Sequence, residues 1–168
     1  MHPKTIAYQF GLCSYVLEKN LGGVSHQESL VNPQPGGNCL NWVVGHLTRV
    51  RNRALGLFGE KPLFPDHDFD AYDDNGGVPF SADTAIPFDE LKRRFKALQE
   101  PWVKGLNGIS KEALDKPAPL SPTGNPNETV GSLLAALAFH EAYHAGQTGM
   151  LRRLVGREGV IKPPRVAV

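Results

Sequence analysis

The segment HEAYH, residues 140–144, places two histidines four positions apart with a glutamate directly after the first. Residues four apart on a helix share one face, with β-carbons roughly 6 Å apart, so two such imidazoles can bind one metal ion. The same string matches the H-E-x-x-H motif of zinc proteases, in which the glutamate is the general base. A buried histidine pair that is satisfied by hydrogen bonds alone is the third interpretation.

Both histidines lie in the apolar seam of a long predicted helix. This helix is expected from about Thr129 to Val155, with Thr129 or Asn127 as its N-terminal cap and Gly156 as its terminator. The spacing of four and three residues along the seam predicts that its side chains face the interior of the protein. The seam positions 133, 137, 140, 144, 147, 151 and 154 carry Leu, Leu, His, His, Gln, Leu and Leu.

Buried imidazole and amide groups need partners. Without them, each group would cost about 1–3 kcal/mol, and an apolar side chain would fill the same space at lower free energy. A metal ion satisfies imidazoles well, and we therefore predict His140 and His144 as metal ligands. Gln147, one turn beyond His144, is predicted to orient a ligand imidazole. Glu141 is displaced by about 100° from His140 around the helix, so it is the candidate catalytic base toward a metal-bound water, or it simply faces a neighbouring helix.

A third histidine occupies the matching seam position of a second predicted helix, which runs from an Asn38 cap to Phe58 and stops at Gly59. His46 can therefore complete a three-histidine site. Three protein ligands with open positions describe a catalytic or substrate-binding centre, whereas structural zinc usually has four protein ligands. Imidazole suits zinc, nickel, copper and iron alike, so the residues alone do not name the metal. The apolar stripe around this histidine consists of Cys39, Val43, His46, Val50, Arg53 and Leu57.

The rest of the chain predicts the scaffold that positions these side chains. Two further helices are expected over residues 3–21 and from Pro87 through Trp102, where Pro101 should kink or end the helix. No segment has the two-residue period of a strand. Four helices with one apolar stripe each are buried most simply as a four-helix bundle, and the long connection of residues 60–86 permits a crossover. We expect an all-α protein with a single domain over residues 1–168.

The amino-acid composition limits the classes of partner that the protein is expected to bind. Eighteen Lys and Arg residues against 17 Asp and Glu residues give a net charge of +1, so no strong field favours nucleic acid or an anionic membrane, and a small molecule is the expected partner. Two cysteines, Cys13 and Cys39, are too few for a disulfide framework and fit a reducing compartment. No leader opens the chain, and no run approaches the roughly 20 apolar residues of a spanning helix. We expect a cytoplasmic protein.

Two phrases resemble a known family. NCLNWVVGHLTRVRNRALGLFG, with its Asn-x-x-x-Trp-x-x-x-His pattern, and HEAYHAGQTGMLRRLVG are similar to the DinB-like (YfiT-like) superfamily of metal-binding four-helix bundles. The resemblance implies an up-down-down-up bundle with a crossover, homodimers, and a divalent ion, often nickel or zinc. It maps the three metal-binding histidines onto His46, His140 and His144. Family members of known activity are mostly thiol transferases or isomerases that use bacillithiol, mycothiol or glutathione, and many others are described only as metal-dependent hydrolases.

These observations favour a metal-dependent enzyme that acts on a small molecule, as a thiol S-transferase or a hydrolase, with a low-molecular-weight thiol as one candidate substrate. A non-enzymatic bundle that binds a metal or ligand is the first alternative, and a plain bundle whose role is dimerisation is the second. A metalloprotease is less favoured. Its extended motif fails here, because Gln147 and Met150 stand where a glycine and a third histidine would be.

Overall fold

The computed structural model describes residues 3–73 and 78–161, and within these ranges it contains helices and no β-strand. The predicted all-α fold is therefore confirmed. None of the described helices is long and apolar enough to cross a membrane. The elements are α1 (Pro3–Leu21), α2 (His26–Ser29), α3 (Leu40–Ala54), η1 (Leu55–Phe58), η2 (Asp66–Tyr72), α4 (Phe88–Ala97), α5 (Gln99–Gly108), α6 (Lys111–Leu114) and α7 (Val130–Leu154), of which η1 and η2 are 3₁₀ helices.

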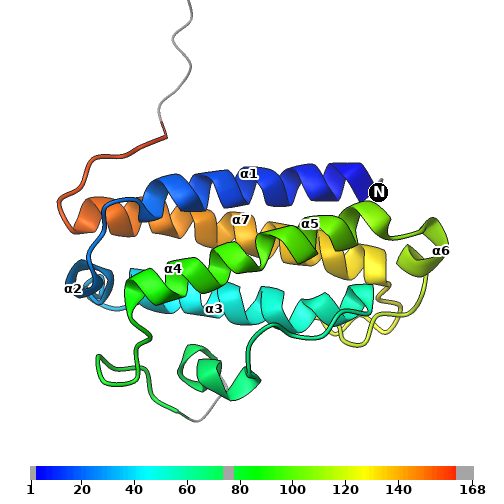
Figure 1. The fold of residues 1–168 in the computed structure, drawn as a ribbon, viewed down its shortest axis with the longest axis horizontal. Helices are drawn as coiled ribbons and strands as arrows, with labels where there is room; N and C mark the ends of the chain where they lie inside the picture. Colours follow the sequence, from blue (N-terminus) through cyan, green and yellow to red (C-terminus); the bar gives the residue numbers. More distant parts are fainter. Residues whose placement is uncertain (1–2, 74–77, 162–168) are drawn as a thin grey trace, which may run out of the picture.

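The long helices form a bundle in which α1 lies beside α7, and α3 lies beside α4 and α7 (Figure 1). α1 and α7 begin at one end of the bundle, whereas α3 and α4 begin at the other end (Figure 1). The chain after η1 therefore travels back along the bundle through η2 before it enters α4. Two clusters of buried side chains fill the interior, one centred on α3, η2 and α4 and the other on α1, α5 and α7.

The first and last long helices agree closely with the sequence prediction. α1 has the predicted bounds, and its stripe is buried. α7 differs from its prediction by one residue at each end. Thr129 caps it through a capping box, because its Oγ1 accepts from the Ser132 N–H at 3.2 Å while its own N–H donates to Ser132 Oγ at 2.9 Å. Gly156 follows with a left-handed φ of 78°, a conformation that glycine adopts without a steric cost.

The start of α3 corrects one prediction. The N-cap is Cys39, so the expected Asn38 cap was wrong. The Cys39 side chain makes no capping hydrogen bond in the described part of the chain, but it is fully buried. The helix therefore starts at a residue that packs in the core, and this residue provides no side-chain cap. At the other end, the final turn tightens into η1 before Gly59, whose φ of 76° ends the helix where the sequence predicted.

The predicted break near Pro101 is present. α4 ends at Ala97 and α5 begins at Gln99, while Pro101 occupies the first turn of α5. A proline ring clashes with the carbonyl four residues earlier, here that of Ala97, and it lacks the N–H that would bond to it. Helical structure then continues beyond Trp102 to Gly108, because a proline is tolerated in a first turn.

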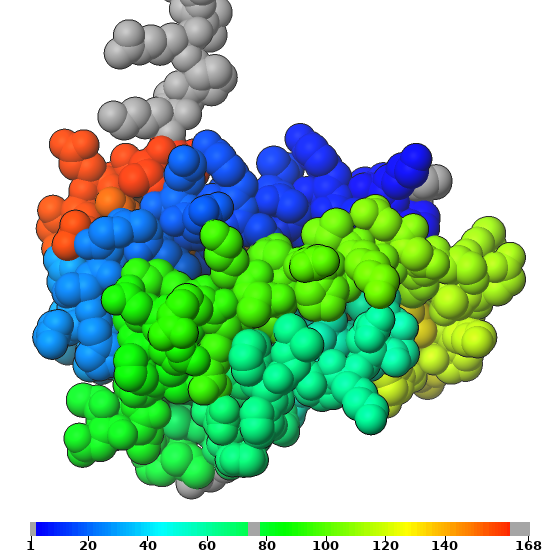
Figure 2. All heavy atoms as spheres, viewed as in Figure 1, coloured from blue at the N-terminus to red at the C-terminus, as the bar shows by residue number. Residues whose placement is uncertain are grey.

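The break also separates the packing of the two halves. α4 packs against α3 and α5 packs against α1. A groove of about 850 Å³ lies between α1 and the α4–α5 pair, with Tyr15, Phe95 and Lys96 among its lining residues. The space-filling view shows this face, where the α1 side chains (blue) meet those of α4 and α5 (green) (Figure 2).

The described residues of the connection 60–86 include an element that the sequence analysis did not predict. It contains η2, and the side chains of Phe69 and Tyr72 are fully buried. The Tyr72 ring lies directly on Gly45 of α3, where an added β-carbon would stand 2.0 Å from its Cδ1 atom. Tyr72 also donates its hydroxyl hydrogen to Asn41 Oδ1 at 2.9 Å. This loop is therefore fixed against α3 beside His46.

Gly45→Ala should destabilise the protein by about 1–3 kcal/mol, because the new methyl group forces Tyr72 off α3. The free energy of unfolding in urea measures this loss. Gly11→Ala is the matched control, since it lies within a helix and an added β-carbon there meets nothing within 4 Å. That control should stabilise the protein by up to about 1 kcal/mol. Equal effects of both substitutions would contradict the packing of Tyr72 on Gly45.

Candidate metal centre

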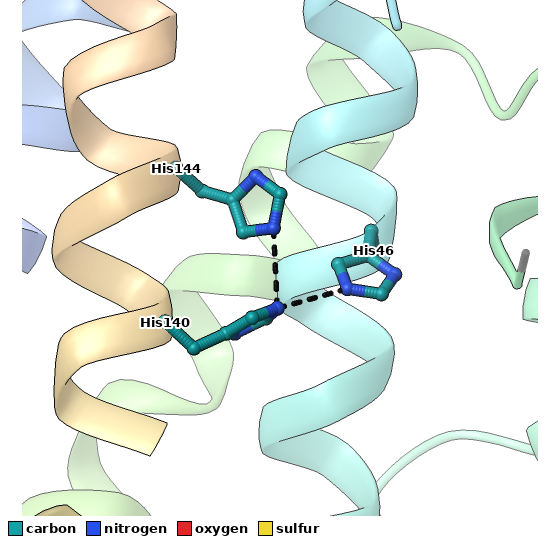
Figure 3. Close-up of side chains that lie close together, drawn as sticks. All are labelled: His46, His140 and His144. Atoms are coloured by element: carbon teal, nitrogen blue, oxygen red, sulfur yellow. Dashed lines mark hydrogen bonds between the residues drawn. The ribbon is translucent and has the colours of Figure 1, made fainter. Parts of the chain in front are cut away.

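The structure brings the three predicted histidines together between α3 and α7. Figure 3 shows His46 projecting from α3 toward His140 and His144 on α7. The Nε2 atom of His140 lies 3.1 Å from Nε2 of His46 and 3.1 Å from Nε2 of His144. One nitrogen from each ring lies within 4.8 Å of the other two. The seam positions deduced from helical spacing thus meet at one point across the helix pair.

Hydrogen bonds at the Nδ1 atoms of His46 and His144 fix the tautomers of these two rings. Nδ1 of His46 lies 3.0 Å from the carbonyl oxygen of Tyr72, and Nδ1 of His144 lies 2.7 Å from Oε1 of Gln147. Both oxygens can only accept, so both Nδ1 atoms carry the hydrogen, and in the neutral form of each ring the Nε2 atom presents a lone pair. These lone pairs face Nε2 of His140, which has at most one hydrogen to donate. At most one hydrogen is therefore available for hydrogen bonds among the three converging Nε2 atoms. A cation, in contrast, could accept a lone pair from each of them.

His140 is the least satisfied of the three rings. Its Nδ1 atom is buried and has no hydrogen-bond partner among the described residues. Burial, followed by the neighbouring His144 and His46 rings, lowers the pKa of His140 to about 4. The ring is therefore neutral near pH 7. Metal binding requires neutral imidazoles, so the environment of His140 favours the form that can coordinate an ion.

The donor set fits a divalent transition metal. Zinc binds imidazole at about 2.0–2.1 Å with near-tetrahedral angles, which puts ligand nitrogens about 3.3 Å apart. The two distances of 3.1 Å are close to that separation. Three imidazoles leave room in the coordination sphere for water or substrate. His46 and His140 are half-buried, and His144 is 8% exposed, so the site is neither open surface nor sealed core.

Neighbouring side chains hold the rings in place. Gln147, which the sequence predicted to orient a ligand imidazole, lies with its Oε1 atom 2.7 Å from Nδ1 of His144, and the orienting role stays a prediction. The Trp42 ring stacks on His46 with 4.8 Å between centroids and 8° between planes. Tyr72 was missed in the sequence analysis, because it acts through its main-chain carbonyl and no side-chain pattern identifies such a contact.

Glu141 lies in a different environment from the one predicted for a catalytic base. Its side chain is 2% exposed, and its two carboxylate oxygens accept hydrogen bonds from Arg51, one of them from Nε at 2.7 Å. Burial raises the pKa of Glu141, and the Arg51 guanidinium opposes that rise. The general-base prediction gains no support from this geometry, because the carboxylate is bound to Arg51 and is not part of the histidine cluster.

The chain was compared with models of known protein families. The model of the DinB superfamily matches residues 9–148, a range that includes all three histidines. The chain belongs to the DinB superfamily. This superfamily is metal-binding, and a metal-binding role for the three histidines is in line with that membership. No curated protein sequence matches the chain significantly.

Gln147→Leu should weaken metal binding by about 10- to 100-fold, because His144 loses the acceptor that fixes its tautomer. Competition titration against a chromophoric chelator measures the affinity. Gln9→Leu, an exposed change on α1, serves as the control and should leave the affinity unchanged. Unaltered affinity in the Gln147 variant would show that its contact with His144 does not contribute.

Proposed function

We propose that this DinB-superfamily protein is a divalent-metal-dependent enzyme that acts on a small molecule, as a thiol S-transferase or a hydrolase. His46, His140 and His144 would hold the metal, with zinc or nickel as the leading candidates. One observation carries the proposal: three imidazole nitrogens converge in a largely buried site, two of them on rings whose Nδ1 atoms already donate to an oxygen. This arrangement leaves lone pairs that a metal ion would satisfy.

A metal bound there would activate a water toward a pKa of about 7 or hold a substrate thiol as its thiolate. The residues of the chain orient the ligands for either reaction. Tyr72 and Gln147 keep the hydrogens of His46 and His144 on Nδ1, so that both Nε2 atoms stay available. The stacked Trp42 ring limits rotation of His46 and excludes water from one of its faces. A low-molecular-weight thiol remains our proposal for the substrate class.

The protease alternative loses support from the structure. A metalloprotease of this motif needs its glutamate as a general base, but Glu141 is buried against Arg51. The described residues also contain no strand along which an extended peptide could pair.

A non-enzymatic bundle that binds a metal or ligand stays the main alternative, because the same three histidines would serve it equally well. A cytoplasmic location and a single domain over residues 1–168 also stay proposals.

His140→Ala should abolish metal binding, because His140 contributes the nitrogen that the other two rings face. Elemental analysis of tag-free protein after dialysis should find about one divalent ion per wild-type chain and almost none in the variant. His67→Ala is the control, since the His67 side chain is 80% exposed on η2, and it should retain the metal.

The same proteins then test catalysis. Wild type should act on members of a panel of thiols with electrophiles, or of esters, and His140→Ala should not. Full activity in a metal-free preparation would contradict the proposal. Stoichiometric metal with no turnover on any substrate would favour the non-enzymatic alternative.

We also propose a homodimer, for which the exposed face of α7 offers a surface. Phe139, Tyr143 and Met150 are 74%, 58% and 72% exposed and recur at steps of four and seven residues, so they form an apolar stripe on α7. Met150→Glu should shift a dimer toward monomer in sedimentation velocity, because it buries a charge at the contact. Leu120→Glu, at another exposed apolar side chain, should not. A wild-type monomer at all concentrations would refute the dimer.

A further inference from the structure

A buried ion pair crosses the same helix contact as the histidines. Arg51 of α3 and Glu141 of α7 each have 2% of their side chain exposed. Glu141 directly follows His140, and Arg51 lies five residues after His46, which is about 7.5 Å along the helix. The ion pair and the histidine cluster are therefore two adjacent contacts between α3 and α7.

The guanidinium of Arg51 is held on several sides. Its central carbon lies 4.6 Å from the centroid of the Phe95 ring and 5.7 and 5.8 Å from those of Phe10 and Trp102. Nη2 donates to Ser14 Oγ at 2.8 Å, while Nη1 is buried without a hydrogen-bond partner among the residues that the structure describes. Side chains of α1, α4 and α5 thus fix Arg51 in position, and Glu141 must meet it there.

Stability alone does not explain this pair. Desolvating two charges costs several kcal/mol for each ion, and well-packed apolar side chains of similar volume are often as stable or more stable. A bidentate carboxylate–guanidinium contact does add directionality. If α7 slid along α3 by part of a turn, Arg51 and Glu141 would separate and leave two unpaired charges in the core. The apolar contacts around them would tolerate the same slide at a smaller cost.

We propose that the Arg51–Glu141 pair fixes the register of α3 against α7, so that His46 meets His140 and His144 at one metal ion. Both are positioning residues, since they act through the helices that carry the ligands. This inference rests on the proposed metal centre. It also assigns a role to the glutamate of the HEAYH segment that differs from that of a catalytic base.

The test replaces the pair by apolar side chains in the double variant Arg51→Met/Glu141→Leu. The variant should remain folded with a melting temperature equal to or above that of wild type. Its affinity for zinc should fall by about 10- to 100-fold, and the visible spectrum of the cobalt-substituted protein should change because the ligand geometry changes. The control Lys111→Met/Asp115→Leu removes an exposed ion pair of α6 and should change neither readout.

Wild-type affinity and an unchanged cobalt spectrum in the double variant would overturn the register proposal. If that variant does not fold, Arg51→Lys supplies the same test, because lysine keeps the charge but loses the bidentate contact. A folded Arg51→Lys protein with wild-type affinity and spectrum would overturn the proposal as well, whereas weaker binding would support it.

A metal-independent readout separates this inference from the proposed function. Proton NOEs between the His46 and His140 rings of metal-free protein report the contact across α3 and α7, where the two Nε2 atoms lie 3.1 Å apart. The double variant should lose or weaken these NOEs. Failure of wild type to bind any metal would refute the metal centre alone. Unchanged NOEs between the two rings in the double variant would refute the register role.

Discussion

Three imidazole rings meet between α3 and α7, and their facing Nε2 atoms carry too few hydrogens to bond all of them to one another. The surrounding residues cause this deficit. Tyr72 and Gln147 take the Nδ1 hydrogens of His46 and His144. This leaves two lone pairs directed at His140, which lies 3.1 Å from each partner nitrogen. Apolar side chains would fill the seam at lower cost. The three histidines could therefore hold a metal ion.

The scaffold supplies the precision that such a site needs. Metal–ligand distances tolerate only a few tenths of an ångström, whereas apolar helix packing alone allows larger shifts. The Arg51–Glu141 contact restricts sliding of α3 along α7, and the Tyr72 ring on Gly45 fixes the loop that carries the carbonyl partner of His46. This rigid support lets three side chains from two helices direct their nitrogens toward one point.

The HEAYH segment shows how one string of letters can serve different chemistry. In a zinc protease the glutamate faces the metal, whereas the glutamate here faces Arg51 from within the bundle core. The difference lies in what packs against the helix. Glu141 is rotated by about 100° from His140, so it meets whichever neighbour the bundle places on that side. The family match over residues 9–148 agrees with this placement in a helical bundle.

The sequence by itself determined the all-α fold, the bounds of α1, those of α7 to within one residue at each end, and the three seam histidines, because helical periodicity and terminal caps are local properties. The contact between Gln147 and His144, three residues apart on one helix, follows from the same spacing. Only the tertiary structure decided that Cys39 is the N-cap of α3, that η2 packs on Gly45, and that Glu141 pairs with Arg51. These features depend on residues far apart in the chain. The two members of the ion pair are 90 positions apart, and no local pattern records which side chains a folded bundle brings together.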